Sequence, residues 1–203
     1  SRNSTGVRGI KRSVDDRVIS MSILDHQEID IDARDVYLKH ASADRRNGND
    51  NTSRDLSQGH DEQDRSLAER EEMILSVTEN GYGKRTSAYE YRITRRGGQG
   101  IINIATSPRN GPVVASFAVK ATDQLMLVTD AGKLIRIPVS DIRIAGRNTQ
   151  GVTLFKTKKR ERVVSVIRLG AESEIDNIGG DENTEGDKAD EPEELAGDME
   201  NEL

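Results

Sequence analysis

The sequence contains no cysteine, so disulfide bonds and thiol chemistry are excluded from this chain. Aromatic residues make up only 3% of it, and there is no tryptophan. No apolar run approaches the length of a membrane-spanning helix, and the opening residues lack the apolar stretch of a signal peptide. We therefore expect a protein of the reducing cytoplasm with no membrane partner.

Residue patterns of the common enzyme sites are also missing. There is no Gly-x-Ser-x-Gly sequence and no Walker-type Gly-Lys-Ser/Thr loop. The three histidines lie far apart without metal-ligand spacing, as solvated loop residues would: His26, His40 and His60. Three acidic residues recur near expected turns, where a turn role is favoured over acid–base catalysis: Glu79, Asp130 and Asp141. We expect no catalytic residue and no metal ligand in this chain.

Charge is distributed unevenly along the chain. Residues 73–170 hold 17 basic and 6 acidic residues, whereas residues 171–203 hold 14 acidic residues and a single lysine. Residues 26–72 are also acidic, with 13 acidic and 7 basic residues. With only 33% apolar residues in total, part of the chain should be solvated rather than packed. We predict a basic folded region, an acidic insert and a disordered acidic tail.

What the chain does contain is an internal repeat. Residues 77–101 return 51 positions later as residues 128–152, with Val, Thr, Gly, Arg and Gln shared at matching positions. A partial third copy opens the chain, because residues 2–7 match residues 147–152 and residues 18–24 match residues 163–169. A period of about 50 residues is typical of propellers, solenoids and arrays. Since the chain begins inside a repeat and without Met, we interpret it as a fragment of a longer protein.

Each repeat unit is expected to hold about four short strands and almost no helix, which is the pattern of a propeller blade. Expected strands cover residues 18–24, 73–78, 84–92, 101–104, 113–119, 125–129, 133–139, 152–156 and 163–169. Turns are expected at Asn80-Gly81 (type I′), at Asn110-Gly111 and at residues 130–132. Gly6 and Gly100 are separated by 94 positions instead of 51, so about 43 residues are inserted between the first two units.

The predicted organisation is thus an all-β fold of antiparallel blades forming an incomplete ring. Residues 1–25 would end one blade, residues 26–72 would form the acidic insert, residues 73–170 would form two blades, and residues 171–203 would form the tail. Within the insert, the pattern predicts short helices over residues 33–41 and 64–72, with disorder over residues 47–60.

The loop at residues 95–100, RRGGQG, is a candidate anion site. Adjacent glycines let a backbone approach a ligand closely, and two arginines supply the charge that phosphates require. Alternatively, the glycines only allow the loop to turn and pack between strands. The second copy at residues 146–151, GRNTQG, keeps one arginine and should bind phosphate less well.

Basic residues also recur along the expected return strands. Lys84, Arg85 and Arg92 in one unit are followed by Lys133, Arg136 and Arg143 in the next. Cations at a constant interval on successive blades would form a curved track for a bent polyanion, although an ordinary solvated outer face would look the same. Residues 156–162, KTKKRER, are either a phosphate clamp or a soluble hairpin.

Two stretches carry a resemblance to a known family. ILSVTENGYGKRTSAYEYR followed by RRGGQGI, and later DQLMLVTDAGKLIRIPVSDIRIAGRNTQGVTLF, resemble the C-terminal domain of the A subunit of bacterial DNA gyrase. The resemblance covers roughly residues 1–25 and 73–170. It implies a β-pinwheel, a propeller variant with six blades of four strands, which wraps DNA around a basic rim.

The family's signature loop reads glutamine, two basic residues, two glycines, a basic residue and glycine. Residues 95–100 resemble it, but Thr94 precedes the arginine pair and Gln99 stands where a basic residue is usual. We interpret this loop as a degenerate copy in a later blade. The principal loop, the DNA-cleaving tyrosine and the breakage–reunion domain are expected upstream, so the fragment should be inactive alone.

By this resemblance the chain would support ATP-dependent negative supercoiling of double-stranded DNA by a type II topoisomerase. Its partners would be DNA, the B subunit of gyrase and a second copy of the A subunit in an A2B2 holoenzyme, located in the cytoplasm at the nucleoid. ATP and Mg would belong to the holoenzyme, with no cofactor in this fragment. The expected DNA-binding residues are Lys84, Arg85, Arg92, Arg95, Arg96, Gly97, Gly98, Gly100, Lys133, Arg136, Arg143 and Arg147. The alternatives are the corresponding subunit of topoisomerase IV and a non-catalytic propeller that binds proteins.

Overall fold

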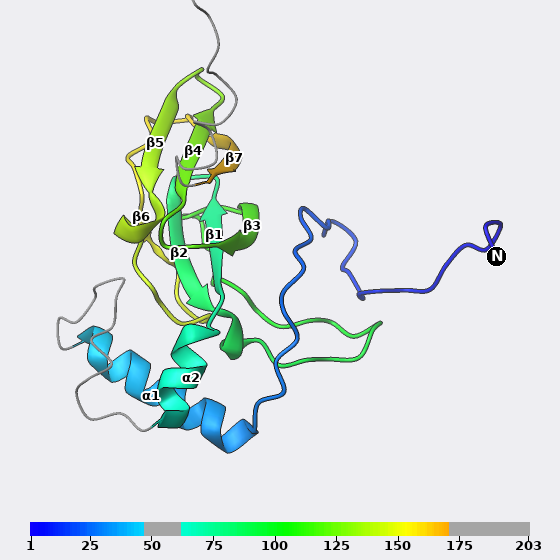
Figure 1. Ribbon diagram of the computed structural model, residues 1–203. Coiled ribbons are helices and arrows are strands. Elements are labelled where there is room, and N and C mark those ends of the chain that lie inside the picture. Colours follow the sequence, from blue (N-terminus) through cyan, green and yellow to red (C-terminus); the bar gives the residue numbers. More distant parts are fainter. Residues whose placement is uncertain (47–61, 171–203) are drawn as a thin grey trace, which may run out of the picture. The chain divides into compact units, whose positions relative to one another are not determined.

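The computed structural model describes residues 1–46 and 62–170 (Figure 1). The segment predicted to be disordered, residues 47–60, and the acidic tail, residues 171–203, lie outside the described residues. In chain order the elements are α1 (Ile31–Arg46), α2 (Glu62–Glu69), β1 (Met73–Thr78), β2 (Tyr82–Ser87), η1 (Ala88–Glu90), β3 (Val113–Val119), β4 (Gln124–Thr129), β5 (Leu134–Pro138), η2 (Val139–Asp141), β6 (Val152–Thr153) and β7 (Val163–Leu169).

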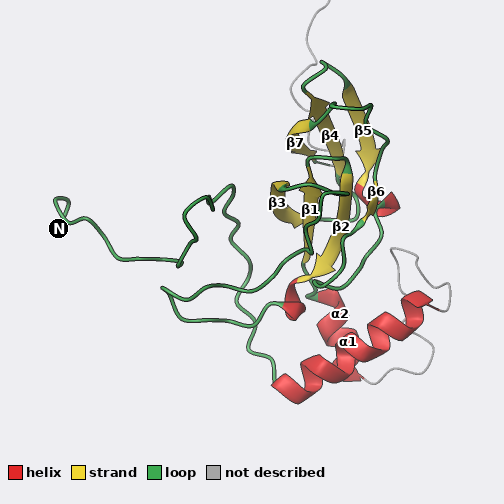
Figure 2. Ribbon diagram, turned by 180° about the vertical axis from the view of Figure 1, so that it is seen from behind, coloured by secondary structure: helices red, strands yellow, loops and turns green. Residues whose placement is uncertain are grey.

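The described strands form two antiparallel sheets, with the orders β3-β1-β2-β6 and β5-β4-β7 (Figure 2). The hairpins β1–β2 and β4–β5 occupy equivalent places in the two repeats. The pairing of β1 with β3 shifts register between Val77 and Thr78, and that of β4 with β7 shifts between Val128 and Thr129, the equivalent positions. The all-β blade architecture predicted from the repeat is confirmed.

Strand β6 completes the sheet of the preceding repeat rather than its own. Val152 pairs with Gly83, and Thr153 pairs with Tyr82. Just before β6, the Arg85 N–H donates to the Arg143 carbonyl at 2.9 Å, and the Ala145 N–H donates to the Arg85 carbonyl at 2.8 Å. The expectation that each unit holds its own four strands is therefore wrong in this respect: the outer edge of β2 is covered by the second repeat.

This exchange explains why the strand expected at residues 101–104 is absent. Residues 101–102 are the repeat equivalents of β6, which pairs with the return strand of the preceding repeat at Gly83 and Tyr82. The described residues before β1 hold the helices α1 and α2 and no strand, so they offer residues 101–102 no equivalent partner. A strand without a partner cannot satisfy its backbone, and residues 101–104 remain a loop.

The strand expected at residues 18–24 is absent for a similar reason. Its equivalent, β7, pairs with β4 so that Ser165 lies opposite Val128, 37 positions earlier. The described residues around Ser20 contain no hairpin strand at this interval. The segment touches β3 through one bond, from Ser20 Oγ to the Ser116 carbonyl at 2.6 Å.

The hairpin turn at Asn80-Gly81 forms, but it is not type I′. Gly81 has φ of 77°, whereas Asn80 is not among the described residues with positive φ. The Gly81 N–H donates to the Thr78 carbonyl at 3.1 Å, so residues 79–81 form a three-residue loop with glycine in the left-handed position. Gly132 repeats this arrangement, with φ of 75° and a bond to the Thr129 carbonyl at 3.0 Å.

Strand lengths differ from expectation mainly after the hairpins. The strands expected at residues 73–78, 113–119 and 163–169 are confirmed to the residue. The return strands are shorter, because β2 ends at Ser87 and η1 follows, with the Ser87 side chain accepting from the Tyr89 N–H. Likewise β5 ends at Pro138 before η2, and β6 spans two residues rather than five.

The two sheets share one apolar core. Its buried side chains come from β1, β3, β4, β7 and the η2 region: Leu75, Val77, Val119, Leu125, Leu127, Val139, Ile142 and Val163. Alternation along β1 and β4 directs every second side chain to this core, which fixes the face that each strand leaves for polar contacts.

The insert folds as the predicted pair of helices, with longer or shifted bounds. It has a core of its own, formed by Tyr37, Ala41, Leu67 and Tyr89. The rings of Tyr37 and Tyr89 meet edge to face with centroids 5.7 Å apart, and the Tyr89 hydroxyl donates to the Leu67 carbonyl at 2.9 Å. Since Tyr89 belongs to η1, which follows β2, the helices pack against the chain at the end of the first return strand.

Candidate nucleic-acid interface

The two glycine-rich loops follow η1 and η2, and we call residues 95–100 the first strap and residues 146–151 the second strap. Each strap binds the backbone of the preceding repeat at equivalent positions. In the first, the Lys11 N–H donates to the Gly98 carbonyl at 2.7 Å; in the second, the Ala105 N–H donates to the Thr149 carbonyl at 3.1 Å. The repeat in sequence is therefore also a repeat of tertiary contacts.

Glycine lets the first strap approach residues 8–11 closely. The Gly97 N–H donates to the Gly9 carbonyl at 2.6 Å, and a Cβ at Gly100 would lie 3.2 Å from Ile10 Cδ1. Both glycines have φ of 81°. The packing interpretation of Gly97 and Gly100 is thus supported, although Gly98 and Gly100 are both exposed.

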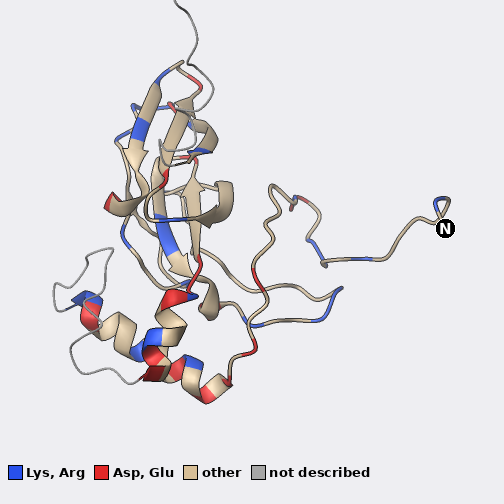
Figure 3. Ribbon diagram, in the orientation of Figure 1, with Lys and Arg blue, Asp and Glu red and all other residues tan. Residues whose placement is uncertain are grey.

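The side chains of the first strap are turned to solvent. Arg95 and Arg96 are exposed, and neither makes a side-chain hydrogen bond or ion pair with a residue in the described part of the chain. Arg92, just before them, and Arg8 and Lys11, across the backbone pairing, are exposed as well. We call these five residues the loop-pair cations; Figure 3 shows the blue arginines at the tip of the loop after η1.

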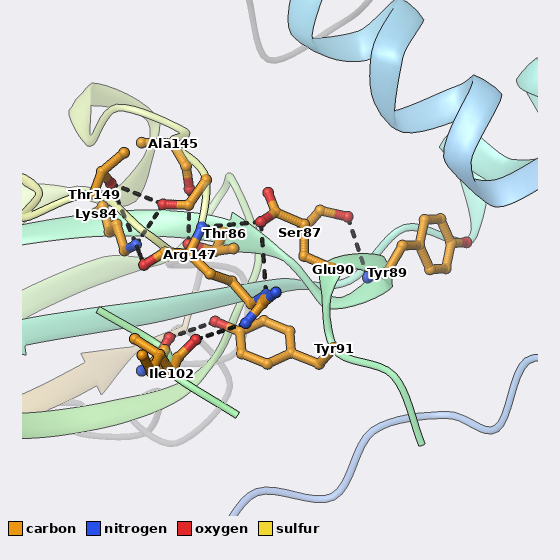
Figure 4. A network of polar contacts seen from close by, with 12 residues as sticks. Lys84, Thr86, Ser87, Tyr89, Glu90, Tyr91, Ile102, Ala145, Arg147 and Thr149 are labelled. Carbon is orange, nitrogen blue, oxygen red and sulfur yellow. Dashed lines mark hydrogen bonds and ion pairs between the residues drawn. The ribbon is translucent and has the colours of Figure 1, made fainter. Parts of the chain in front are cut away.

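Lys84 is directed inward, to the second strap (Figure 4). Its Nζ donates to the carbonyls of Gly146 at 2.6 Å and Arg147 at 2.8 Å, and to Thr149 Oγ1 at 3.3 Å. The side chain is fully buried. Burial lowers the pKa of Lys84 to about 8, opposed by the nearby Glu90 carboxylate and reinforced by Arg147.

Arg85 is also used internally. Its Nε donates to the Ile142 carbonyl at 2.6 Å and its Nη2 to the Ser140 carbonyl at 3.1 Å. Only 3% of Arg85 is exposed. Our prediction that Lys84 and Arg85 lie on a surface track for DNA is wrong, because β2 is an interior strand covered by residues 140–153 of the next repeat.

Arg147 belongs to the second strap but is largely engaged. Its Nη1 donates to the Ile102 carbonyl at 2.8 Å, its backbone N–H donates to Glu90 Oε2 at 2.9 Å, and its guanidinium lies 5.9 Å from the centroid of the Tyr91 ring. Tyr91 donates in turn to Asn103 Oδ1, and burial raises its pKa to about 12. Arg147 therefore holds the strap, in contrast to Arg96 at the equivalent position.

The remaining expected residues lie in the second repeat and are exposed. Lys133 Nζ forms an ion pair with Glu161 at 2.8 Å, and Arg136 Nε donates to Gln124 Oε1 at 2.5 Å. Arg143 makes no side-chain hydrogen bond or ion pair within residues 1–46 and 62–170. The hydrogen bond from Lys133, then that from the Lys158 N–H, lower the pKa of Glu161 to about 2.

Residues 156–162 form an ordered turn, and the phosphate-clamp interpretation stays a prediction. Glu161 organises the turn, since its Oε2 accepts from the Lys158 N–H at 2.8 Å, and Arg162 pairs with Glu79 at 3.1 Å. Lys156, Lys159 and Arg160 remain exposed. The backbone is thus that of an ordered turn that presents cations.

Sequence reasoning missed three cations near these loops. Arg8 and Lys11 were overlooked, although the partial third copy aligns Lys11 with Ala105 and so with a strap contact. Arg109 was also overlooked; its guanidinium lies 5.2 Å from the Tyr82 ring centroid, and its Nε donates to the Tyr82 hydroxyl at 3.2 Å. The hydrogen bond from the Arg109 side chain is the main cause that lowers the pKa of Tyr82. No pattern in the sequence indicated that Arg109 and Tyr82 would be paired.

Comparison with known proteins identifies a family. The model of a family described as "DNA gyrase C-terminal domain, beta-propeller" matches residues 1–25, 72–120 and 123–169, leaving out the helical insert. The chain is 45% identical over 196 residues to the A subunit of DNA gyrase from Granulibacter bethesdensis, covering 89% of this chain and 21% of that protein. It is 48% identical over 184 residues to the A subunit of DNA gyrase from Rickettsia bellii, covering 87% and 20%.

Among solved structures, a DNA gyrase A C-terminal domain aligns with a TM-score of 0.45 at 28% identity, covering 48% of this chain and 33% of that one. The chain spans about a fifth of the length of the curated relatives it matches. Neither helix of the described residues is long and apolar enough to cross a membrane.

Proposed function

Because this chain belongs to the family of DNA gyrase C-terminal domains, we propose that it binds double-stranded DNA and bends it along its basic face. In the whole protein this binding would support ATP-dependent negative supercoiling by a type II topoisomerase. The chain itself would supply cations and shape but no bond-breaking chemistry.

The observation that carries the proposal is the exposure of the loop-pair cations to solvent. Arg92, Arg95 and Arg96 on one side, and Arg8 and Lys11 on the other, are exposed around backbone hydrogen bonds that fix the two loops together. A cation used to hold the fold is bound to carbonyls or carboxylates, as Lys84 and Arg147 are. Exposed cations on an ordered support are suited to phosphate oxygens instead.

Energetics agree with binding through the backbone of DNA. Bending a few tens of base pairs costs on the order of 1–10 kcal/mol. Residues 73–170 hold 17 basic against 6 acidic residues, so many phosphates can be neutralised without any contact to bases. Binding of this kind is insensitive to sequence and sensitive to how easily the duplex bends.

The remaining partners follow from the family and extend the proposal. A second copy of the gyrase A chain and two B chains would complete an A2B2 holoenzyme, in which ATP and Mg bind outside this chain. The protein would act in the cytoplasm, on nucleoid DNA.

A salt titration tests the proposal. Affinity of the full-length protein for a fluorescent duplex is measured by anisotropy over a range of salt concentrations. We expect log affinity to fall linearly with log salt, with a slope of about −0.9 for each phosphate neutralised. A flat titration would overturn the proposal and favour a propeller that binds proteins.

A further inference from the structure

We propose that Lys84 is a positioning residue for DNA bending, which fixes the second strap to the return strand of the preceding repeat and so sets the placement of the exposed cations of the two repeats. This inference rests on the proposed function. It assigns Lys84 a role that differs from the direct phosphate contact expected from its sequence.

The contacts form a ladder between two repeats, which we call the carbonyl ladder. Three consecutive residues of β2 donate to main-chain carbonyls of the next repeat: Arg85 to Ser140 and Ile142, Thr86 to Ala145, and Lys84 to Gly146 and Arg147. All the acceptors lie within eight residues of chain, Ser140 to Arg147, and Figure 4 shows the contacts of Lys84 and Thr86 with this segment. The ladder therefore links the two repeats at their junction and does not lie within either repeat.

Lys84 is the end of the ladder that holds the second strap itself. Its three donors meet three acceptors between 2.6 and 3.3 Å, so the buried ammonium is fully hydrogen-bonded. Removing it would take this donor away from the Gly146 and Arg147 carbonyls, although the Gly146 carbonyl would still accept from the Thr149 N–H at 3.2 Å and from Thr149 Oγ1 at 2.8 Å. The lowered pKa of Lys84 reflects the same burial.

The ladder is specific to this junction among the described residues. Lys84 is equivalent to Ile135 in the second repeat, and Arg85 is equivalent to Arg136, which is exposed and bonded to Gln124. A cation kept for DNA would be expected to recur at the equivalent surface position of the next unit. Lys84 does not recur, which is consistent with a residue that holds together one particular pair of repeats.

The ladder lies between the two groups of exposed cations. Arg95 and Arg96 follow β2 and η1 in the first repeat, whereas Arg143 lies within the segment that the ladder binds. Without Lys84, two hydrogen bonds would still hold the second strap. The Arg147 N–H would donate to Glu90 Oε2, and the Ala105 N–H would donate to the Thr149 carbonyl. Each cation would thus remain, but the interval between the two groups would be less strictly fixed.

The experiment separates binding from bending in the full-length protein carrying Lys84→Met. Affinity is measured on a duplex too short to reach both repeats, and bending is measured as the linking-number change trapped when nicked circles are sealed with the protein bound. We expect short-duplex affinity to change by less than about twofold, because every phosphate-binding cation is still present. We expect the trapped linking-number change to fall by at least about half, because bending depends on cation placement.

Lys120→Met is the matched control. Lys120 is exposed, and its backbone N–H, not its side chain, binds Asp123. It removes the same charge away from the straps and should leave the trapped linking-number change as in the wild type. If Lys84→Met fails to give a cooperative thermal transition, Thr86→Val removes a single rung of the ladder and should lower the linking-number change in the same direction.

Two results would overturn the inference while leaving the proposed function intact. One is an unchanged linking-number change in both Lys84→Met and Thr86→Val. The other is a loss of short-duplex affinity in proportion to the loss of bending, which would make Lys84 a phosphate ligand. A wild-type protein that binds no duplex would instead sink the proposed function and this inference with it.

Discussion

At the scale of single residues, the basic side chains of this chain divide according to what their donors meet. Lys84 and Arg85 donate to buried carbonyls, whereas Arg95 and Arg96 face solvent. The same residue type therefore serves the fold at one position and remains available to a ligand a few residues later.

Neutralising the first strap should affect binding and not stability. We expect the double change Arg95→Gln and Arg96→Gln to lower the salt slope by about 0.9 for each phosphate that is no longer neutralised, with the free energy of unfolding changed by less than about 0.5 kcal/mol. Arg147→Gln should do the reverse, because it breaks bonds to Ile102 and Glu90. Anisotropy and thermal unfolding of both variants check this, and equal effects on binding would contradict it.

Glu161 should make stability depend on pH in acid. Its pKa of about 2 in the folded protein is below the ordinary 4.5, so the carboxylate stabilises the fold fully above pH 4.5. That contribution is lost as the pH falls from 4.5 toward about 2. Glu161→Gln should therefore lower the Tm at neutral pH, with the difference from wild type closing toward about pH 2. A Tm difference that stays constant across this range would refute the assignment.

Gly151 is required for close approach between repeats as well as for its φ. Its φ is 79°, and a Cβ there would lie 2.7 Å from the Gly83 carbonyl oxygen. Gly132 has a similar φ of 75° but nothing within 4 Å of a built Cβ, which makes it a matched control. We expect Gly132→Ala to cost about 1 kcal/mol and Gly151→Ala at least about 1–2 kcal/mol more, measured by urea unfolding. Equal costs would show that only φ matters.

Part of the candidate site could be predicted from the sequence. The wrong predictions concern residues whose burial depends on the neighbouring repeat. The repeat aligned Arg85 with Arg136 and Arg96 with Arg147 correctly, yet in each pair one member is exposed and the other is engaged. Sequence identity at equivalent positions does not fix burial, because the neighbour on each side differs between repeats. The exposed loop at residues 95–100 was predicted because it depends only on local glycine and arginine.

At the scale of elements, a strand needs both a pattern and a partner. Strands β1, β3 and β7 were predicted to the residue, since each has apolar residues facing the shared core. Residues 18–24 and 101–104 have similar patterns but pair with no strand in the described part of the chain. Partner availability is a long-range property, which local periodicity does not report.

The helical insert should open independently of the sheets. Leu67 is 2% exposed in the core of the insert, which touches the sheets through Tyr89. Leu67→Ala should destabilise the insert by about 2–4 kcal/mol through the cavity it leaves. Hydrogen exchange should then speed up in α1 and α2 while β1 and β4 keep their protection. Equal loss of protection in β1 would show that insert and sheets form one cooperative unit.

At the scale of the whole molecule, the proposal requires one duplex to contact both repeats. Arg143→Gln alone should lower the salt slope, and its effect should add to that of Arg95→Gln with Arg96→Gln, each phosphate left without a cation contributing about 0.9. The measurement is the slope for all three variants on a duplex long enough to bend. If Arg143→Gln changes nothing in either background, DNA engages only the first repeat.

The exchange of β6 also has a consequence for the newborn chain. Gly83 and Val152 lie 69 positions apart, so during translation the outer edge of β2 stays bare until the second repeat has left the ribosome. At roughly 5–20 residues per second this interval lasts several seconds. Bare strand edges invite aggregation, but here the waiting strand reads Tyr-Gly-Lys-Arg-Thr-Ser and stays well hydrated. The same charged and polar residues that later hold the two repeats together are thus suited to oppose aggregation of this strand before β6 pairs with it.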